Sequence, residues 1–413
     1  MTATGPCNAL DAGDPVDVVT LGESMVTFLP TTSGRLADVP SFDRGIGGAE
    51  SNVACTLAAA GHAARWVSRV GADGFGDHLV EAIGACGVDV GAVHRDPDRP
   101  TGIYFRTAGD RSTDAHEVAY YRAGSAASAM SVENTDLQAV RAGRVLHLSG
   151  ITAALSPDCL GLMRELTARR PGRPLVSFDV NYRPGLWADA DGSGVLLDLA
   201  RASDLVFVGE DEAEEAWGIT GGPGAIRKAL PEPAVLVVKQ GARGATALTG
   251  PRTPVPPAAV PDPDHGDASP APGHEAGLLA AAPGAVPPAP VPPAAAPGPG
   301  AAQETVTFVP ALEVDVFVPA LEVDVVATIG AGDAFAAGFL SATLRGLPVR
   351  DRLRHGHLMA AAALTVPGDL APPPARDHAD RLADLDDDAW GTLRLGPGWT
   401  KAADRGDEEV RTS

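Results

Sequence analysis

Several features that would place this 413-residue chain in a particular protein class are missing. Only four cysteines are present and none forms a CxxC pair, so we expect neither a zinc site nor a disulfide framework. Lys and Arg (32) are outnumbered by Asp and Glu (53), and the net charge of −21 disfavours nucleic acid and anionic membranes as partners. The sequence contains no run of apolar residues long enough for a membrane span and no signal-peptide pattern. These absences predict a cytoplasmic protein.

What is present is typical of a globular α/β protein. Residues 1–15 are predicted to form a flexible leader, followed by a domain over 16–370. From about residue 140, short runs rich in Val and Leu alternate with helical stretches, which favours a mostly parallel sheet with helices on both faces. Acidic clusters in 371–413 predict a solvated acidic C-terminal tail.

Two interruptions stand out. Residues 250–303 hold 16 of the 37 prolines and are predicted to be a disordered insertion. Just after them, the nine residues FVPALEVDV occur at 308–316 and again at 317–325, which indicates a tandem duplication. We expect the copy adjacent to Ala327 to supply the native strand, and the other to bulge out or to pair with it as a hairpin.

The segment most suggestive of chemistry contains a glycine turn, GAGD, between a strand end and a helix. Gly330, Ala331 and Gly332 allow a tight turn whose amides, at a helix N-terminus, would form an anion hole. Asp333 then lies in the first helical turn, where its carboxylate could accept the proton of an attacking hydroxyl. The alternative is that Asp333 only complements the helix dipole. No GxxxxGK[ST] motif is present, and no GxGxxG follows the first strand, which argues against a P-loop enzyme and a dinucleotide-dependent oxidoreductase.

Other polar residues follow the predicted buried strands. Because ligands gather at the carboxyl ends of parallel strands, these positions are candidates for the same site. They are Asn181, Arg183, Glu212 and Lys239.

Five segments, in this order, resemble the ribokinase-like (PfkB) family of carbohydrate kinases: GIGGAESNVACTLAAAGH, RVGADGFGDHL, DVNYRPGLW, VVKQGARGATAL and IGAGDAFAAGF. The resemblance covers about 16–250 and 304–370. It implies a three-layer α/β/α sandwich with a small β-sheet lid, here from parts of 23–45 and 100–125. Strand-like alternation around 101–109 and 116–124 agrees with a hairpin in the second of these. Pairing of lid strands between subunits would give a homodimer.

Within the family, the segments LGESMVTFLP, TGIYF, YYRAGSAAS, LHLSGITAALS and DVNYRPGLW are most similar to the 2-keto-3-deoxygluconate kinases. The similarity implies a sugar site made by Gly48, Asn52, Tyr104, Tyr120, Arg122 and Arg183. Two arginines suit a sugar acid, because guanidinium groups bind carboxylates in a bidentate way. The alternatives are surface ion pairs for the arginines and strand packing for the tyrosines.

The resemblance also implies ATP and Mg²⁺ as cofactors. Lys239, Gly241 and Gly244 would bind the nucleotide together with Gly332, and Glu212 would act on magnesium through water. Lys239 could instead end a strand in solvent, and Glu212 could simply be an acid favoured at a helix start. His357 could lie near the adenine or be a solvated helix histidine.

The chain departs from the family pattern at three positions. Gly209 stands where the family's NxxE element has Asn, Ala327 replaces an Asp that helps many members bind a monovalent cation, and Ile329 replaces a polar residue. We therefore expect little potassium dependence.

The function expected from the sequence is ATP-dependent phosphorylation of 2-keto-3-deoxygluconate at its terminal hydroxyl. The alternatives are a fructokinase, ribokinase or nucleoside kinase of the same family, and a non-catalytic sugar-binding regulator.

Overall fold

The computed structural model describes residues 15–107, 117–187, 192–250 and 315–404. Nearly all of the predicted leader and of the predicted insertion lies outside these ranges. None of the helices within them is long and apolar enough to cross a membrane.

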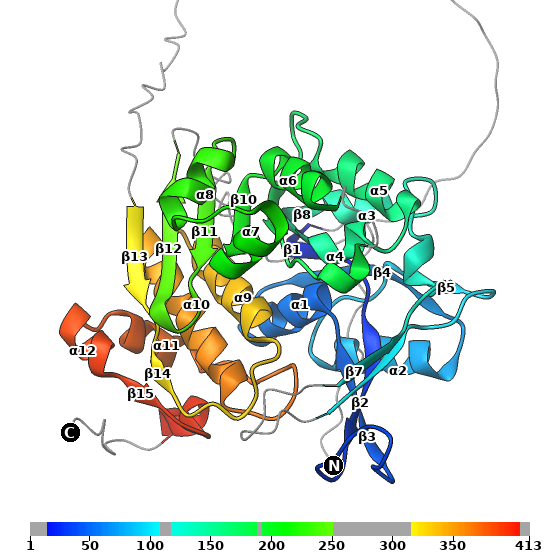
Figure 1. Cartoon of the computed structure of the whole chain (residues 1–413), viewed down its shortest axis with the longest axis horizontal. Helices are drawn as coiled ribbons and strands as arrows, with labels where there is room; N and C mark the ends of the chain where they lie inside the picture. Colours follow the sequence, from blue (N-terminus) through cyan, green and yellow to red (C-terminus); the bar gives the residue numbers. More distant parts are fainter. Residues whose placement is uncertain (1–14, 108–116, 188–191, 251–314, 405–413) are drawn as a thin grey trace, which may run out of the picture. The chain divides into compact units, whose positions relative to one another are not determined.

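A nine-stranded sheet forms the centre of the described chain, in the order β13-β12-β11-β10-β9-β8-β1-β4-β5 (Figure 1). The strands from β11 to β5 are parallel, and β12 and β13 join the β11 edge in antiparallel fashion. The predicted mostly parallel sheet is therefore confirmed. The bounds are β1 Val16–Leu21, β4 Ala64–Gly71, β5 Val93–Asp96, β8 Gly143–Ser149, β9 Leu175–Asp179, β10 Leu205–Gly209, β11 Val235–Lys239, β12 Gly244–Thr249 and β13 Asp315–Pro319.

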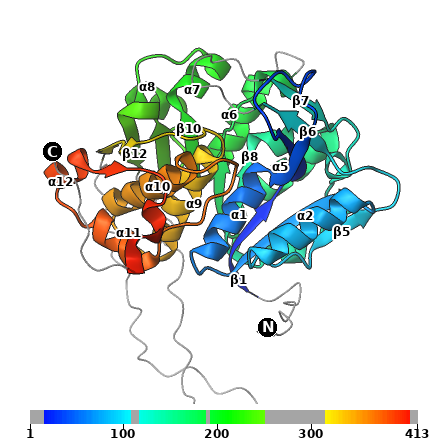
Figure 2. The same ribbon diagram turned by 90° about the horizontal axis from the view of Figure 1, so that it is seen from below.

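Alternating side chains of these strands fill two separate cores. Val18 and Phe207 face a core shared with α1, α9 and α10, whereas their neighbours Val19 and Val206 face one shared with α5, α6 and α8. The period of two along a strand thus gives two apolar faces, each covered by helices, as predicted for a three-layer sandwich (Figure 2). The helices are α1 Ala49–Ala59, α2 Gly74–Ala85, α3 Leu137–Arg141, α4 Gly150–Ala153, α5 Pro157–Thr167, α6 Gly192–Ala202, α7 Glu210–Trp217, α8 Pro223–Ala229, α9 Ala331–Leu344, α10 Val349–Leu364, α11 Arg376–Ala383 and α12 Asp387–Thr392.

Local sequence explains where several helices begin. Asp73 caps α2 by accepting hydrogen bonds from the amides of Phe75 and Gly76, and Ser156 caps α5 just before a proline at its first position. At α9 the N-cap is Gly330, whose φ of 77° lies in the left-handed region that favours glycine. The glycine turn predicted before Asp333 is therefore present.

A second, four-stranded sheet lies beside the carboxyl end of β1, with the order β3-β2-β6-β7. Its β6 and β7 strands form the predicted antiparallel hairpin, and β2 pairs in parallel with β6. These strands arise from the two segments predicted for the lid, with β3 extending two residues further. Their bounds are β2 Met25–Pro30, β3 Phe42–Gly47, β6 Ile103–Arg106 and β7 Val118–Tyr121.

The prediction of a solvated tail over 371–413 is wrong for the described residues. Trp390 of α12 is 1% exposed and donates a hydrogen bond from Nε1 to the carbonyl of Pro319. Strand β15 (Arg394–Leu395) pairs with β14 (Glu322–Val323), and Leu395 is part of the core. The acids that suggested a tail, such as Asp387, lie on the solvent-facing side of these elements. In the sequence they alternate with the buried apolar residues, so the segment has the composition of a solvated tail.

The prediction that the second copy of the duplicated nonapeptide alone supplies the strand is wrong. Strand β13 straddles the junction of the two copies, since it takes its first two residues from the first copy and three from the second. The second copy then leaves the large sheet at Pro319 and continues into β14. The remaining residues of the first copy lie outside the described ranges, so the predicted bulge or hairpin stays a prediction.

Candidate active site

A cavity of about 530 Å³ opens at the carboxyl ends of the parallel strands, between the large sheet, the small sheet and the start of α9. Its volume lies in the range of small-ligand sites. Most of the residues predicted to bind substrate or nucleotide line it: Gly48, Asn52, Tyr104, Tyr120, Arg122, Arg183, Glu212, Lys239, Gly330, Gly332 and Asp333.

Asp333 is positioned by two packed helices. It lies in the first turn of α9, and its Oδ2 accepts a hydrogen bond from Asn52 Nδ2 of α1 at 2.9 Å. Burial raises the pKa of the Asp333 carboxyl to about 7, against the opposing effect of the Asn52 hydrogen bond. A carboxylate at the cavity edge with a pKa near neutrality matches what a general base requires.

Lys239, at the end of β11, lies between two carboxylates. Its Nζ is 3.0 Å from Asp179 Oδ2 and 3.9 Å from Glu212 Oε2. Burial opposes its charge, but these neighbours raise the pKa of Lys239 above its ordinary value. A Cβ added to Gly332 would lie 3.7 Å from Nζ, so the ammonium group adjoins the N-terminus of α9. This places positive charge where an anionic phosphoryl group would meet the helix.

Glu212 has a structural partner as well as a place in the cavity. Its Oε2 accepts a hydrogen bond from the Gly209 amide at 2.6 Å, which caps the start of α7. Burial raises the pKa of Glu212. The missing Asn side chain at Gly209 therefore leaves the acid in position.

The small sheet contributes a buried ionic contact. Asp369, which follows α10, accepts hydrogen bonds from the hydroxyl of Tyr104 at 2.8 Å and from Arg106 Nη2 at 2.7 Å. Both members of the Arg106–Asp369 pair are 4% exposed. The carbonyl of Asp369 also abuts Gly330, where an added Cβ would come within 2.3 Å of it. Asp369 thus connects the small sheet to the turn that precedes Asp333.

The two arginines predicted for the sugar differ in environment. Arg122, which follows β7, is ion-paired with the buried Glu23 and lies over the ring of Tyr120. The side chain of Arg183 is 55% exposed and its Nη1 is 3.7 Å from Glu212 Oε1. Beside it, Asn181 holds a positive φ of 42°, a strained conformation that is often found at functional sites.

Comparison with known proteins identifies the fold. Residues 16–264 and 303–376 match the pfkB family of carbohydrate kinases. The chain is 30% identical over 371 residues to the 2-dehydro-3-deoxygluconokinase of Bacillus subtilis, covering 88% of this chain and 94% of that protein.

The chain belongs to the pfkB family of carbohydrate kinases.

Two further proteins are similar to this chain. This kinase is 30% identical to fructokinase-1 of Zea mays over 204 residues, 49% of this chain and 62% of that protein. Its structure matches the crystal structure of a PfkB protein from a Polaromonas species with a TM-score of 0.66 at 29% identity, over 88% of this chain and 99% of that one.

Three predicted positions of this kinase do not line the cavity. The Ala331 side chain is outside it, Gly241 lies in the turn between β11 and β12, and Gly244 is the first residue of β12. Gly244 has a structural reason to be glycine, because an added Cβ would come within 2.2 Å of the carbonyl of Val318 on β13. The prediction that His357 is solvated is wrong: it is buried against Phe335, and burial lowers its pKa to about 4.

Among the residues that line the cavity, three acids were not predicted as part of the site: Glu23, Asp179 and Asp369. Asp179 ends β9 and Glu23 comes just after β1, so the rule that selected other strand ends would have found both. Asp369 follows a helix, and no sequence pattern indicates it.

Among the described residues, no group of three or more acidic, His or Cys side chains could enclose a metal ion. Mg²⁺ carried by nucleotide phosphates keeps several waters and needs only one or two carboxylates from a protein. Glu212 and Asp179, next to Lys239, are the carboxylates in position for such a contact.

Proposed function

We propose that this kinase transfers the γ-phosphoryl group of ATP to the terminal hydroxyl of a sugar acid, 2-keto-3-deoxygluconate, with Asp333 as the base. The observation that carries the proposal is the Asp333 carboxyl itself. It lies at the N-terminus of α9 and faces a cavity that two guanidinium groups also line.

The base role follows from protonation and geometry. With a pKa of about 7, Asp333 is ionised in a large fraction of molecules at neutral pH, yet is basic enough to take a proton from a hydroxyl in the transition state. Asn52 holds the carboxylate by one oxygen, which leaves the other for the substrate. The hydroxyl oxygen then attacks the γ-phosphorus as Asp333 accepts its proton, and the bond from the γ-phosphorus to the bridging oxygen breaks to release ADP.

Charge that develops on the transferred group needs preorganised donors. The amides of Ala331 and Gly332 at the start of α9 and the ammonium group of Lys239 would supply them. Mg²⁺, when bound with ATP, would neutralise phosphate oxygens, held by Glu212 and Asp179 through water. The nucleotide role of Gly241 and Gly244 stays a prediction.

A sugar acid is favoured over a neutral sugar by Arg122 and Arg183, which both line the cavity. The similarity to a 2-dehydro-3-deoxygluconokinase over most of the chain supports the same substrate class. The fructokinase similarity spans about half of the chain and supports the rival, a neutral sugar. A cytoplasmic location and a homodimer through the small sheet stay predictions.

The test is ADP release by the purified protein with a panel of 2-keto-3-deoxygluconate, gluconate, fructose, ribose and a nucleoside. We expect the highest kcat/KM with 2-keto-3-deoxygluconate, and a loss of about 100-fold or more in Arg122→Ala for this sugar acid but not for the neutral sugars or the nucleoside. Preference for fructose would replace the proposed substrate, and no turnover with any member would favour a binding protein.

A further inference from the structure

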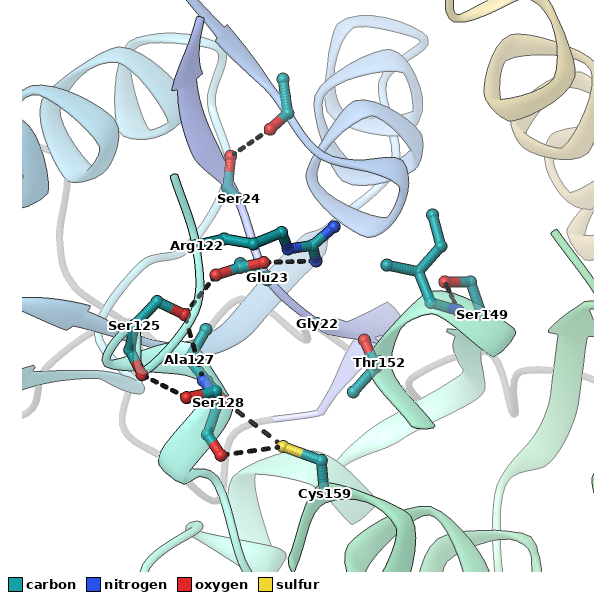
Figure 3. Close-up of polar contacts among 12 residues, drawn as sticks. Gly22, Glu23, Ser24, Arg122, Ser125, Ala127, Ser128, Ser149, Thr152 and Cys159 are labelled. Atoms are coloured by element: carbon teal, nitrogen blue, oxygen red, sulfur yellow. Dashed lines mark hydrogen bonds and ion pairs between the residues drawn. The ribbon is translucent and has the colours of Figure 1, made fainter. Parts of the chain in front are cut away.

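Arg122, one of the two arginines that line the cavity, forms an ion pair that connects the two sheets. Arg122 follows β7 of the small sheet, and its ion-pair partner Glu23 follows β1 of the large sheet (Figure 3). Glu23 lies two residues past the carboxyl end of β1, a central strand that pairs with β4 and β8.

The Glu23 side chain is held in place by its neighbours. Its side chain is 1% exposed, and its Oε1 accepts a hydrogen bond from Ser125 Oγ at 2.5 Å. Gly102 packs against the same oxygen, where an added Cβ would lie 2.9 Å away. The carboxylate therefore has little freedom, and its second oxygen contacts Arg122 Nη2.

The Arg122 guanidinium is held at one end only. Its side chain is 10% exposed, and neither its Nε nor its Nη2 makes a hydrogen bond in the described part of the chain, so the ion pair with Glu23 is what holds Nη2. A guanidinium offers five donors in one plane, so a group that holds one corner sets the direction of the others. Arg122 lines the cavity, so donors that the ion pair leaves unused can serve a carboxylate oxygen there.

We infer that Glu23 is a positioning residue that orients Arg122 to bind the substrate's carboxylate. This inference rests on the proposed function, because it assigns the carboxylate of a sugar acid to Arg122. Glu23 acts through Arg122, because its own side chain is only 1% exposed at the edge of the cavity.

The physical reason is the mobility of a long side chain. An unrestrained arginine has many rotamers, and ordering it when the substrate binds would reduce affinity. Holding it beforehand removes that cost. Glu23 also compensates the buried positive charge when no substrate is present, which keeps Arg122 inside the cavity.

The experiment is a double-mutant cycle on the full chain with Glu23→Ala, Arg122→Ala and the double variant. The readouts are kcat and KM for 2-keto-3-deoxygluconate, with thermal melting to verify folding. We expect KM to rise at least about 10-fold in Glu23→Ala with a much smaller change in kcat, and the double variant to be no worse than Arg122→Ala. Asp38→Asn, which breaks an exposed ion pair in the connection between β2 and β3, is the matched control.

Glu23→Asp provides a second variant if Glu23→Ala does not fold. It keeps the charge but withdraws the carboxylate by one methylene, so KM should rise several-fold. An unchanged KM in whichever variant folds, or additive effects in the cycle, overturns the inference. If Arg122→Ala itself leaves the KM for the sugar acid unchanged, the proposed substrate fails instead.

Discussion

Replacing Asp333 by Asn tests the base and its environment together. The pKa of this carboxyl is raised by burial from its ordinary 3.8 to about 7. Because the folded-state pKa is the higher one, the protonated carboxyl favours folding. That advantage is full below about pH 4 and is lost as the pH rises to about 7.

The magnitude follows from the size of the change. At about 1.36 kcal/mol per pH unit, ionising Asp333 costs about 4 kcal/mol of stability at most. Asp333 is partly exposed to the cavity, so we take about 2 kcal/mol after screening. An Asn side chain removes the charge and can still accept the Asn52 hydrogen bond, so the variant should be more stable at pH 8.

Two assays check this reasoning. Thermal unfolding should show Asp333→Asn about 3 °C more stable at pH 8, with a smaller gain at pH 5. Turnover should fall by about 10²–10⁴-fold with little change in KM, and the wild-type kcat/KM should rise with pH through about 7. Near-normal turnover would refute the base role, and a stability gain that does not depend on pH would refute the raised pKa.

The other predictions concern the small sheet, the C-terminal segment and cations. Asp369→Asn should leave Arg106 buried without its counter-charge and destabilise the protein by about 3 kcal/mol in urea unfolding; a loss as small as that of the exposed control Asp38→Asn contradicts the contact. Trp390→Ala should cost about 3–5 kcal/mol in the same measurement, and a loss below about 1 kcal/mol would mean that the C-terminal segment is not part of the core. With Ala327 in place of an acid, exchanging sodium for potassium should change the rate less than about two-fold, and strong activation would show that a cation site exists.

Much of the fold could be predicted because its signals are local. Buried parallel strands are continuous apolar runs, and the strands β6 and β7 alternate apolar and polar residues. The glycine turn before a helical pattern predicts the start of α9. Most of the site could also be predicted from the polar residues at strand ends, because parallel strands bring their carboxyl ends to one edge of the sheet. Composition gave a wrong prediction for the C-terminal segment, where apolar residues lie among acids. Trp390 was therefore assigned to a solvated tail.

The sequence by itself determined the two-faced parallel sheet, the turn before Asp333 and the kind of side chain at each strand end. Only the tertiary structure decided which of these groups touch. Asn52 holds Asp333 across 281 residues of sequence, Asp369 holds Arg106 across 263, and Glu23 meets Arg122 between two sheets. Such contacts leave no periodic trace, because each depends on how separate elements pack. The same packing sets the desolvation that raises the pKa of Asp333, which no local pattern can convey.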